Sequence, residues 1–273
     1  MRVIAAINQK GGVGKTTTVL NTAHALSLLG QRVLAIDLDA QGHLSDSLGV
    51  RDRGRPAIDD VLLDQQPIQE CITCVRGCMD FIPAGPRLGM FESRYDSATA
   101  MARGWRLYRA LKTVDGYDFV LIDCPPSTGL LAMNALIACQ ELLIPVSSDY
   151  LSLSGVAKLV AVLDHIEHAL AQHNRKWVVM TRYQNRRKLA REVQQKLLEY
   201  FPDNLLATVV RENVALAESP GFGTTIFEYQ RKSYGAVDYL QLAHDLLHER
   251  TMLNDRGGQN GPGVTQATAR RCV

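Results

Sequence analysis

A glycine-rich segment near the start of the chain has the residue types needed to bind phosphate groups. It reads QKGGVGKTT over residues 9–17 and lies between a β-branched run and a helical pattern. Glycines let backbone N–H groups approach phosphate oxygens closely, and a helix N-terminus favours anions. Lys15 can reach the β- and γ-phosphates of a nucleotide, and the Thr16 hydroxyl can coordinate Mg²⁺. A chance glycine-rich turn is the alternative, but the order and position of these residues favour a nucleotide-binding loop. Its predicted contact residues are Gly11, Gly12, Val13, Gly14, Lys15, Thr16 and Thr17.

A second lysine, Lys10, stands at the head of this loop, and Gln9 occupies the position where the usual pattern has a glycine. Two interpretations remain open for Lys10. It is either a solvated surface lysine or a residue that contacts a nucleotide across a dimer interface, since Lys15 already serves its own loop.

Three aspartates follow apolar runs in a pattern that suits magnesium chemistry. Asp37 and Asp39 come at the end of one run and Asp123 at the end of another. Alternation along a strand points Asp37 and Asp39 to the same side, and ligands bind at the carboxyl ends of parallel strands. Asp123 ends a Walker B pattern, which places it for Mg²⁺ through water. The alternative role of each aspartate is to cap a helix or turn.

The elements that would position these residues alternate along most of the chain. Apolar runs predict strands at 3–7, 32–37, 119–123, 142–146, 177–181 and 205–210. Helical spacing predicts helices at 17–29, 156–170, 189–197 and 237–247. This alternation predicts an α/β fold, with a doubly wound, mostly parallel sheet and helices on both faces.

Composition limits the class of protein. The chain has 273 residues, 30 Lys and Arg, 28 Asp and Glu, and a net charge of +2. These values are typical of a globular protein, and a role in nucleic-acid binding would require local clusters of charge. We expect one domain over residues 1–250 and a disordered polar tail over 251–273. With neither an apolar run long enough to span a membrane nor an export signal, we expect a cytoplasmic protein with reduced cysteines.

One local cluster of positive charge stands out against the near-neutral chain. Its members are Arg182, Arg186, Arg187, Lys188 and Arg191, with no acid among residues 182–191. Arg187 and Arg191 share a helix face opposite Leu189 and Val193, which predicts a basic strip suited to phosphate contacts. The alternative is an ordinary solvated helix face.

Two other features suggest further sites. Cys71, Cys74 and Cys78 form a C-x₂-C-x₃-C pattern, but no fourth close Cys or His completes a metal or cluster site. A helix around Trp105 carries arginines at positions 103, 106 and 109, which either solvate one helix face or form a second basic patch.

The motifs KGGVGKTT, DLDAQG and DCPPS together resemble the deviant Walker ATPases, the ParA/Soj/MinD group. The stretches YLSLSGVAKL and ENVALAESPGFGTTI are similar to the ParA/Soj branch. The resemblance covers residues 1 to about 250 and implies a P-loop NTPase with ATP and Mg²⁺ as cofactors. Lys10 resembles the signature lysine that contacts the partner subunit's nucleotide in an ATP-bound sandwich dimer. Lys15 and Thr16 match the phosphate and Mg²⁺ contacts.

The resemblance also assigns roles to the aspartates. Asp39 matches the residue that activates the hydrolytic water, Asp37 a neighbouring Mg²⁺-linked carboxylate, and Asp123 the Walker B residue. The implied catalytic residues are therefore Lys10, Lys15 and Asp39, and the implied metal-site residues are Thr16, Asp37 and Asp123.

The function implied by the resemblance is partition of a plasmid or chromosome in association with the nucleoid. In such proteins the ATP dimer binds non-specific DNA, and a ParB-like partner stimulates hydrolysis and release. Arg191 falls where the family has a DNA-contacting arginine. The chain departs from the family pattern Pro-Arg-Asn-Val-Arg, with Glu212 and Ala215 in place of both arginines and Arg211 one position earlier. Arg211 is therefore a further candidate for DNA binding.

Three other functions stay in view. A MinD-like membrane-positioning ATPase would need a C-terminal amphipathic helix, which the sequence after residue 254 lacks. A scaffold that coats DNA, with incidental hydrolysis, has no separate sequence signature. An electron donor similar to nitrogenase reductase would need two cluster cysteines per subunit, which the DCPP segment does not provide.

Overall fold

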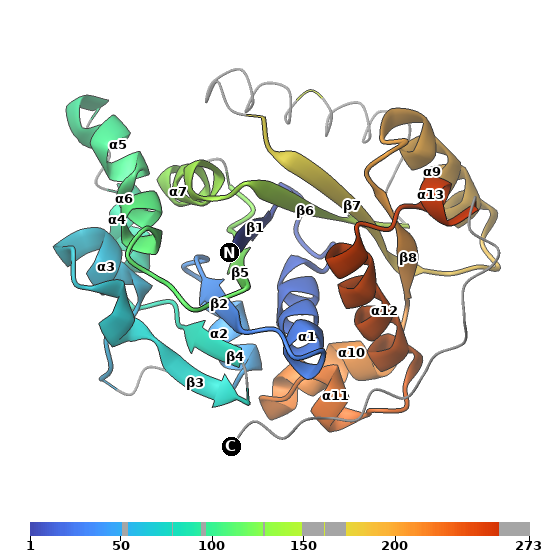
Figure 1. The fold of residues 1–273 in the computed structure, drawn as a ribbon, viewed down its shortest axis with the longest axis horizontal. Coiled ribbons are helices and arrows are strands. Elements are labelled where there is room, and N and C mark those ends of the chain that lie inside the picture. The colour runs from blue at the N-terminus through green and yellow to red at the C-terminus, as the bar shows by residue number, and fades with distance from the viewer. Residues whose placement is uncertain are drawn as a thin grey trace.

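The computed structural model describes residues 1–50, 54–77, 79–93, 97–127, 129–148, 161 and 173–256. Within them, eight strands form one sheet with the order β3-β4-β2-β5-β1-β6-β7-β8 (Figure 1). The strands are β1 (Arg2–Ala6), β2 (Val33–Asp37), β3 (Thr73–Arg76), β4 (Met79–Ile82), β5 (Phe119–Asp123), β6 (Glu141–Ser147), β7 (Arg175–Tyr183) and β8 (Leu205–Arg211). Neighbouring strands are parallel except for β3, which runs antiparallel to β4.

Helices cover both faces of this sheet, and each face has its own apolar core. One core contains buried side chains of α1 (Lys15–Leu28), α2 (His43–Ser47), α10 (Val214–Glu218), α11 (Ile226–Tyr229) and α12 (Tyr234–His248). The other core contains buried side chains of α3 (Ile58–Asp64), α4 (Leu88–Ser93), α6 (Arg106–Leu111), α7 (Leu130–Ala138), α9 (Lys188–Tyr200) and α13 (Met252–Arg256). The other helices among the described residues are α5 (Ser97–Gly104) and the 3₁₀ segments Ile68–Cys71 and Ser219–Phe222. The predicted doubly wound, mostly parallel α/β fold is confirmed.

Strand burial explains why this topology could be read from the sequence. All residues of β2, β5 and β6 are buried, as expected for strands covered by helices on both faces. The predicted strands are confirmed, with ends that differ by a few residues, and β5 has the predicted bounds. The short strands β3 and β4 were not predicted.

Predicted helix ends and the predicted end of the domain also differ from the structure. Helix α1 begins at Lys15 rather than at residue 17, because the left-handed Gly14 stands directly before its first turn. Packed structure also extends past the predicted domain end at residue 250. Thr251 pairs with Leu206 in an isolated antiparallel bridge, and Met252 is buried in the core. The predicted helix at 156–170 and most of the predicted tail lie outside the described residues.

Candidate functional site

The glycine-rich loop joins β1 to α1, as the sequence predicts. Gly12 and Gly14 have φ values of 77° and 88°, a conformation that strongly favours glycine. Gly14 is the residue before α1, and no side chain caps this helix end. The first N–H groups of α1 and its dipole therefore favour an anion at this position.

Neighbouring strands hold the loop in place. The Thr181 hydroxyl of β7 donates a 2.8 Å hydrogen bond to the Val13 carbonyl oxygen. The Asn8 side chain donates a 2.9 Å bond to the Pro145 carbonyl oxygen of β6. The loop is thus anchored to β6 and β7, so its amides are arranged before any ligand arrives.

The two lysines of the loop have different surroundings. Lys15 is the first residue of α1, and its side chain is buried. Lys10 is partly exposed, and its backbone N–H donates to the Asn8 side-chain oxygen at 3.0 Å. The fold therefore encloses Lys15 within its own subunit and leaves Lys10 at the surface.

Asp37 and Asp123 lie side by side at the carboxyl ends of adjacent strands. They are register partners on β2 and β5, and both are buried. Asp37 accepts hydrogen bonds from the Ser45 N–H at 2.8 Å and the Ser45 hydroxyl at 2.7 Å. Neither carboxylate oxygen of Asp123 has a hydrogen-bond partner among the described residues.

Burial perturbs both of these carboxylates. It raises the pKa of Asp37 from 3.8 to about 6, with the hydrogen bonds from Ser45 opposing the shift. Burial also raises the pKa of Asp123 well above its usual value, and the charge of Asp37 adds to this shift, while the nearby Thr16 hydroxyl and Lys15 ammonium oppose it. An unpartnered buried carboxylate beside a second one is costly for the ligand-free protein. The pair has the donor chemistry that Mg²⁺ prefers, and Thr16 stands at the start of the adjacent α1.

Asp39 lies two residues beyond the end of β2, and it is 9% exposed. Its carboxylate accepts a 3.0 Å bond from the Gln41 N–H, and its own N–H donates to Asp37 at 3.2 Å. These backbone turns hold Asp39 close to Asp37 at the same edge of the sheet. All three predicted aspartates are therefore close to the carboxyl ends of β2 and β5, where the phosphate loop also lies.

Ser45 belongs to this site, although the sequence analysis missed it. Its hydroxyl lies between two elements, because it donates to Asp37 and accepts a 3.0 Å bond from the Ala84 N–H. The DLDAQG motif ends three residues before Ser45, so no local pattern marks it. A polar residue within a five-residue helix directly after the motif is the available signal.

The predicted basic strip lies at the end of β7 and along α9. Its five members, Arg182, Arg186, Arg187, Lys188 and Arg191, are all exposed. Lys188 pairs with Glu192 at 3.6 Å on the helix surface, an arrangement that contributes little energy. All five predicted strip residues therefore face solvent.

Two of the predicted DNA contacts are close to acids. Arg182 lies 3.6 Å from Glu212, which follows β8. Arg211 is held by Asp238 of α12 at 2.5 Å and lies over the Tyr234 ring. Part of the positive charge of these arginines is thus balanced within the subunit.

The arginines near Trp105 have structural contacts. Arg103 is buried, donates to the Phe91 carbonyl oxygen at 2.5 Å and lies over the Phe91 ring. Arg106 donates to the carbonyl oxygens of Leu62 and Leu63. These contacts connect α5 and α6 to α3 and α4, so of the three arginines only Arg109 is exposed.

Two of the patterned cysteines belong to different environments. Cys71 is buried, Cys74 is exposed on β3, and Cys78 lies outside the described residues. Among the residues with described positions, no group of three or more His, Cys, Asp or Glu side chains has a metal-binding arrangement. In this same part of the chain, none of the helices combines the length and apolar character needed to cross a membrane.

A phosphate loop between β1 and α1, facing aspartates at the ends of β2 and β5, defines a P-loop nucleoside triphosphatase fold. A family model described as an AAA domain matches residues 1–176. The chain is 36% identical to the chromosome partitioning protein ParA of Myxococcus xanthus, over 93% of this chain and 91% of that protein. It is 39% identical to the chromosome-partitioning ATPase Soj of Thermus thermophilus, over 90% of this chain and 96% of that one. The chain belongs to the ParA/Soj family within the ParA/MinD superfamily of ATPases.

Solved structures agree with this assignment. One is cobyrinic acid a,c-diamide synthase from Mycobacterium smegmatis with a bound ATP analogue and magnesium, with a TM-score of 0.75 and 31% identity. The match covers 91% of this chain and 95% of that one. The two partitioning relatives and the family model confirm the predicted relationship to the ParA/MinD superfamily.

Proposed function

We propose that this protein is a Mg²⁺-dependent partition ATPase that hydrolyses ATP to ADP and phosphate. The observation that carries the proposal is the buried Asp37–Asp123 pair beside Lys15 and the glycine loop. Two buried carboxylates are unfavourable without a bound cation, which Mg²⁺ would supply. The loop favours a polyphosphate, which ATP would supply. Bound Mg²⁺ would neutralise charge that develops on the phosphates.

Different residues of this chain would bind the phosphates, hold the metal ion and activate the attacking water. The loop amides from Gly11 to Thr17 and the ammonium of Lys15 would bind the phosphates. The Thr16 hydroxyl and Asp123 would hold the Mg²⁺ ion. Asp37 is positioned by Ser45 and supports the same cation. Asp39 orients and deprotonates the attacking water, which suits a carboxylate held at the mouth of the site.

Lys10 completes the site of a second copy in this proposal. It is partly exposed, while Lys15 already occupies the subunit's own phosphate position. An ATP-bound sandwich dimer would place each Lys10 on the partner's nucleotide. ATP then shifts the population from monomer to dimer, and hydrolysis reverses the shift.

DNA is the proposed partner of the dimer, and the basic strip on α9 is its contact surface. Exposed arginines and a lysine suit phosphates without reading bases. Two copies of the strip in a dimer would present a longer basic surface than a monomer.

A ParB-like protein would stimulate hydrolysis and release, and the cargo would be a chromosome or plasmid. The protein would act in the cytoplasm, in association with the nucleoid, through one ATPase domain that extends a few residues past the predicted end at residue 250.

Light scattering with ADP or ATP tests the nucleotide switch. We expect monomers with ADP and dimers with ATP·Mg²⁺, and Lys10→Ala should remain monomeric in both. Lys112→Ala, which removes an exposed lysine of the α6 end, is the matched control and should behave like the wild type. If the wild type remains monomeric with ATP·Mg²⁺, the sandwich-dimer mechanism fails.

DNA binding has its own measurement. If the strip neutralises about four phosphates, the logarithm of affinity should fall with the logarithm of salt at a slope near −3.6. A slope near zero with the ATP-bound protein would refute the DNA hypothesis.

A DNA-coating scaffold with incidental hydrolysis is the second candidate, because Asp39 and the strip are separate features of the fold. Asp39→Ala distinguishes the two. The partition-switch proposal expects Asp39→Ala to bind DNA with ATP and to fail to release it. Turnover and release that both persist in this variant would favour the scaffold.

A further inference from the structure

A concave site separate from the nucleotide loop lies between β3, the end of α2, the β4–α4 loop and α11. It is a cavity of about 370 Å³, within the size range of small-molecule sites. Its wall includes Arg55, Cys74, Arg76, Ala84, Gly85 and Glu228. None of these residues belongs to the phosphate loop or to the aspartates at the ends of β2 and β5.

The charged side chains around this cavity favour an anion. Arg76 is largely buried, and its Nε contacts Glu228 at 2.7 Å while its Nη2 donates to the Gly223 carbonyl oxygen at 2.9 Å. Its Nη1 has no hydrogen-bond partner among the described residues. Arg55 is exposed, and within the described chain its side chain has no ion-pair partner. Two guanidinium groups against one carboxylate give the lining a net positive charge, and guanidinium geometry matches phosphate and carboxylate oxygens.

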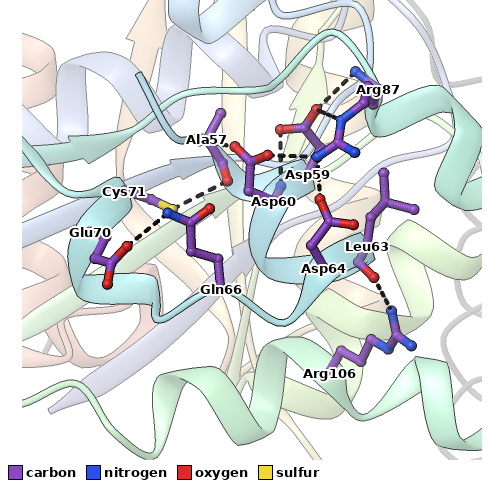
Figure 2. Close-up of polar contacts among 10 residues, drawn as sticks. All are labelled: Ala57, Asp59, Asp60, Leu63, Asp64, Gln66, Glu70, Cys71, Arg87 and Arg106. Carbon is purple, nitrogen blue, oxygen red and sulfur yellow. Dashed lines mark hydrogen bonds and ion pairs between the residues drawn. The ribbon is translucent and has the colours of Figure 1, made fainter. Parts of the chain in front are cut away.

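One wall of the cavity is fixed before any ligand binds. Figure 2 shows that Asp59, Asp60 and Asp64 of α3 all contact Arg87, which follows the Pro83–Pro86 wall. The buried Asp59 also accepts a 2.8 Å bond from the Arg87 N–H. A Cβ at Gly85 would lie 1.6 Å from an Asp59 oxygen, so this wall packs directly on α3. A preformed site loses little conformational entropy when a ligand binds.

A short hydrogen-bond chain joins this wall to the nucleotide site. The Ala84 N–H donates to the Ser45 hydroxyl at 3.0 Å, and that hydroxyl donates to Asp37 at 2.7 Å. Asp37 is the register partner of Asp123. A ligand that shifts Ala84 relative to α2 would therefore change the position of a hydroxyl that holds one of the two buried carboxylates.

We propose that this cavity is a second ligand site, which takes a small molecule bearing a phosphate or carboxylate group and is coupled to the nucleotide site through Ser45. Arg55 and Arg76 bind the anionic group, and the rest of the ligand lies along β3 and the Pro83–Pro86 wall. Ser45 is the positioning residue that relates the two sites. The coupling rests on the proposed nucleotide function, whereas binding in the cavity does not.

The exposed thiol of Cys74 reports directly on occupancy. Iodoacetamide modification of Cys74 is measured by peptide mass spectrometry with inorganic phosphate or malonate as the probe, and with sodium chloride at matched ionic strength. A bound anion should slow modification about threefold at twice its Kd. Arg55→Gln should abolish the protection, and Arg109→Gln, which changes an exposed arginine of α6, should retain it.

The two probes separate the sources of the anionic group. Protection by phosphate alone assigns a phosphorylated ligand, and protection by malonate alone assigns a carboxylate. Equal modification rates with phosphate, malonate and chloride overturn the proposal, as does protection that survives in Arg55→Gln.

A second arm tests coupling with the same readout. Saturating ADP·Mg²⁺ should change the Kd of the probe in the wild type, and reciprocity requires the probe to change the Kd of ADP by the same factor. Ser45→Ala keeps the backbone bond to Asp37 and should bind the probe without this change. Cavity protection without any ADP binding would refute the nucleotide proposal and leave the cavity site standing. ADP binding with an unchanged probe Kd would refute the coupling.

Discussion

Asp37 offers a direct test of the claim that the ligand-free site stores unfavourable charge. Burial raises the pKa of its carboxyl from 3.8 to about 6. The shift of about two units corresponds to roughly 3 kcal/mol of destabilisation when the group is ionised. Asp37→Asn removes this charge and keeps one oxygen for Ser45. The amide cannot accept from both Ser45 and the Asp39 N–H, so a lost bond costs about 1 kcal/mol. We expect a net gain of roughly 2 kcal/mol at pH 7.5 without metal.

The pH dependence follows from the direction of the shift. Because the folded pKa lies above the unfolded value, the unfavourable contribution grows as pH rises from 3.8 through about 6. The advantage of Asp37→Asn over the wild type should therefore be full at pH 7.5 and shrink as pH falls below 6. Urea denaturation in EDTA at several pH values measures it, and Asp203→Asn, at an exposed aspartate, is the control with little expected change.

The same stability measurement with bound nucleotide tests the functional role of Asp37. ADP·Mg²⁺ should stabilise the wild type strongly and Asp37→Asn weakly, so the order of stability reverses when the ligand is present. A variant that is less stable than the wild type at pH 7.5, by an amount independent of pH, would show that Asp37 is not held against an electrostatic cost.

Three further predictions concern other parts of the molecule. Burial lowers the pKa of His24 to about 4, and its Nδ1 contacts the Thr225 hydroxyl, so the free energy of unfolding of the wild type should fall by about 2 kcal/mol between pH 7 and pH 5. His24→Asn should not show this fall, and urea-stability profiles that are parallel for the two proteins would contradict the prediction. Arg187→Gln should reduce the salt slope of DNA binding by about 0.9, as measured by fluorescence anisotropy, and an unchanged slope would exclude this contact. Gly85→Ala should lower the free energy of unfolding by roughly 1–3 kcal/mol because the added Cβ meets Asp59, whereas Gly89→Ala in α4 should be neutral or stabilising. Equal stability of the two variants in urea denaturation would contradict the described packing of the cavity wall.

Much of the site was predictable because its residues follow local rules. An apolar run that ends in aspartate identifies a buried strand and its carboxyl end together, and β5 is found with the predicted bounds. The position of Asp37 beside Asp123 then follows from parallel pairing of β2 and β5. The glycine loop is recognisable because its backbone requires glycine at Gly12 and Gly14.

Other features depend on contacts between distant residues. Arg211 was predicted to contact DNA, but its partner Asp238 is 27 positions away and no local pattern reveals the pair. The strands β3 and β4 have only four residues each, and the cysteine spacing around them suggested a different role. Ser45 gains its importance from Ala84, which a separate strand brings to it.

The two margins of the sheet have a consequence for how copies of this protein can associate. At one margin β3 is short, runs against its neighbour and has an irregular register between Cys74 and Arg76. At the other, Thr251 pairs with Leu206 of β8. Short, irregular or covered margins resist the addition of a strand from another molecule. Higher-order assembly of this chain should therefore proceed through side-chain surfaces, and it should stay reversible instead of growing into cross-β fibrils.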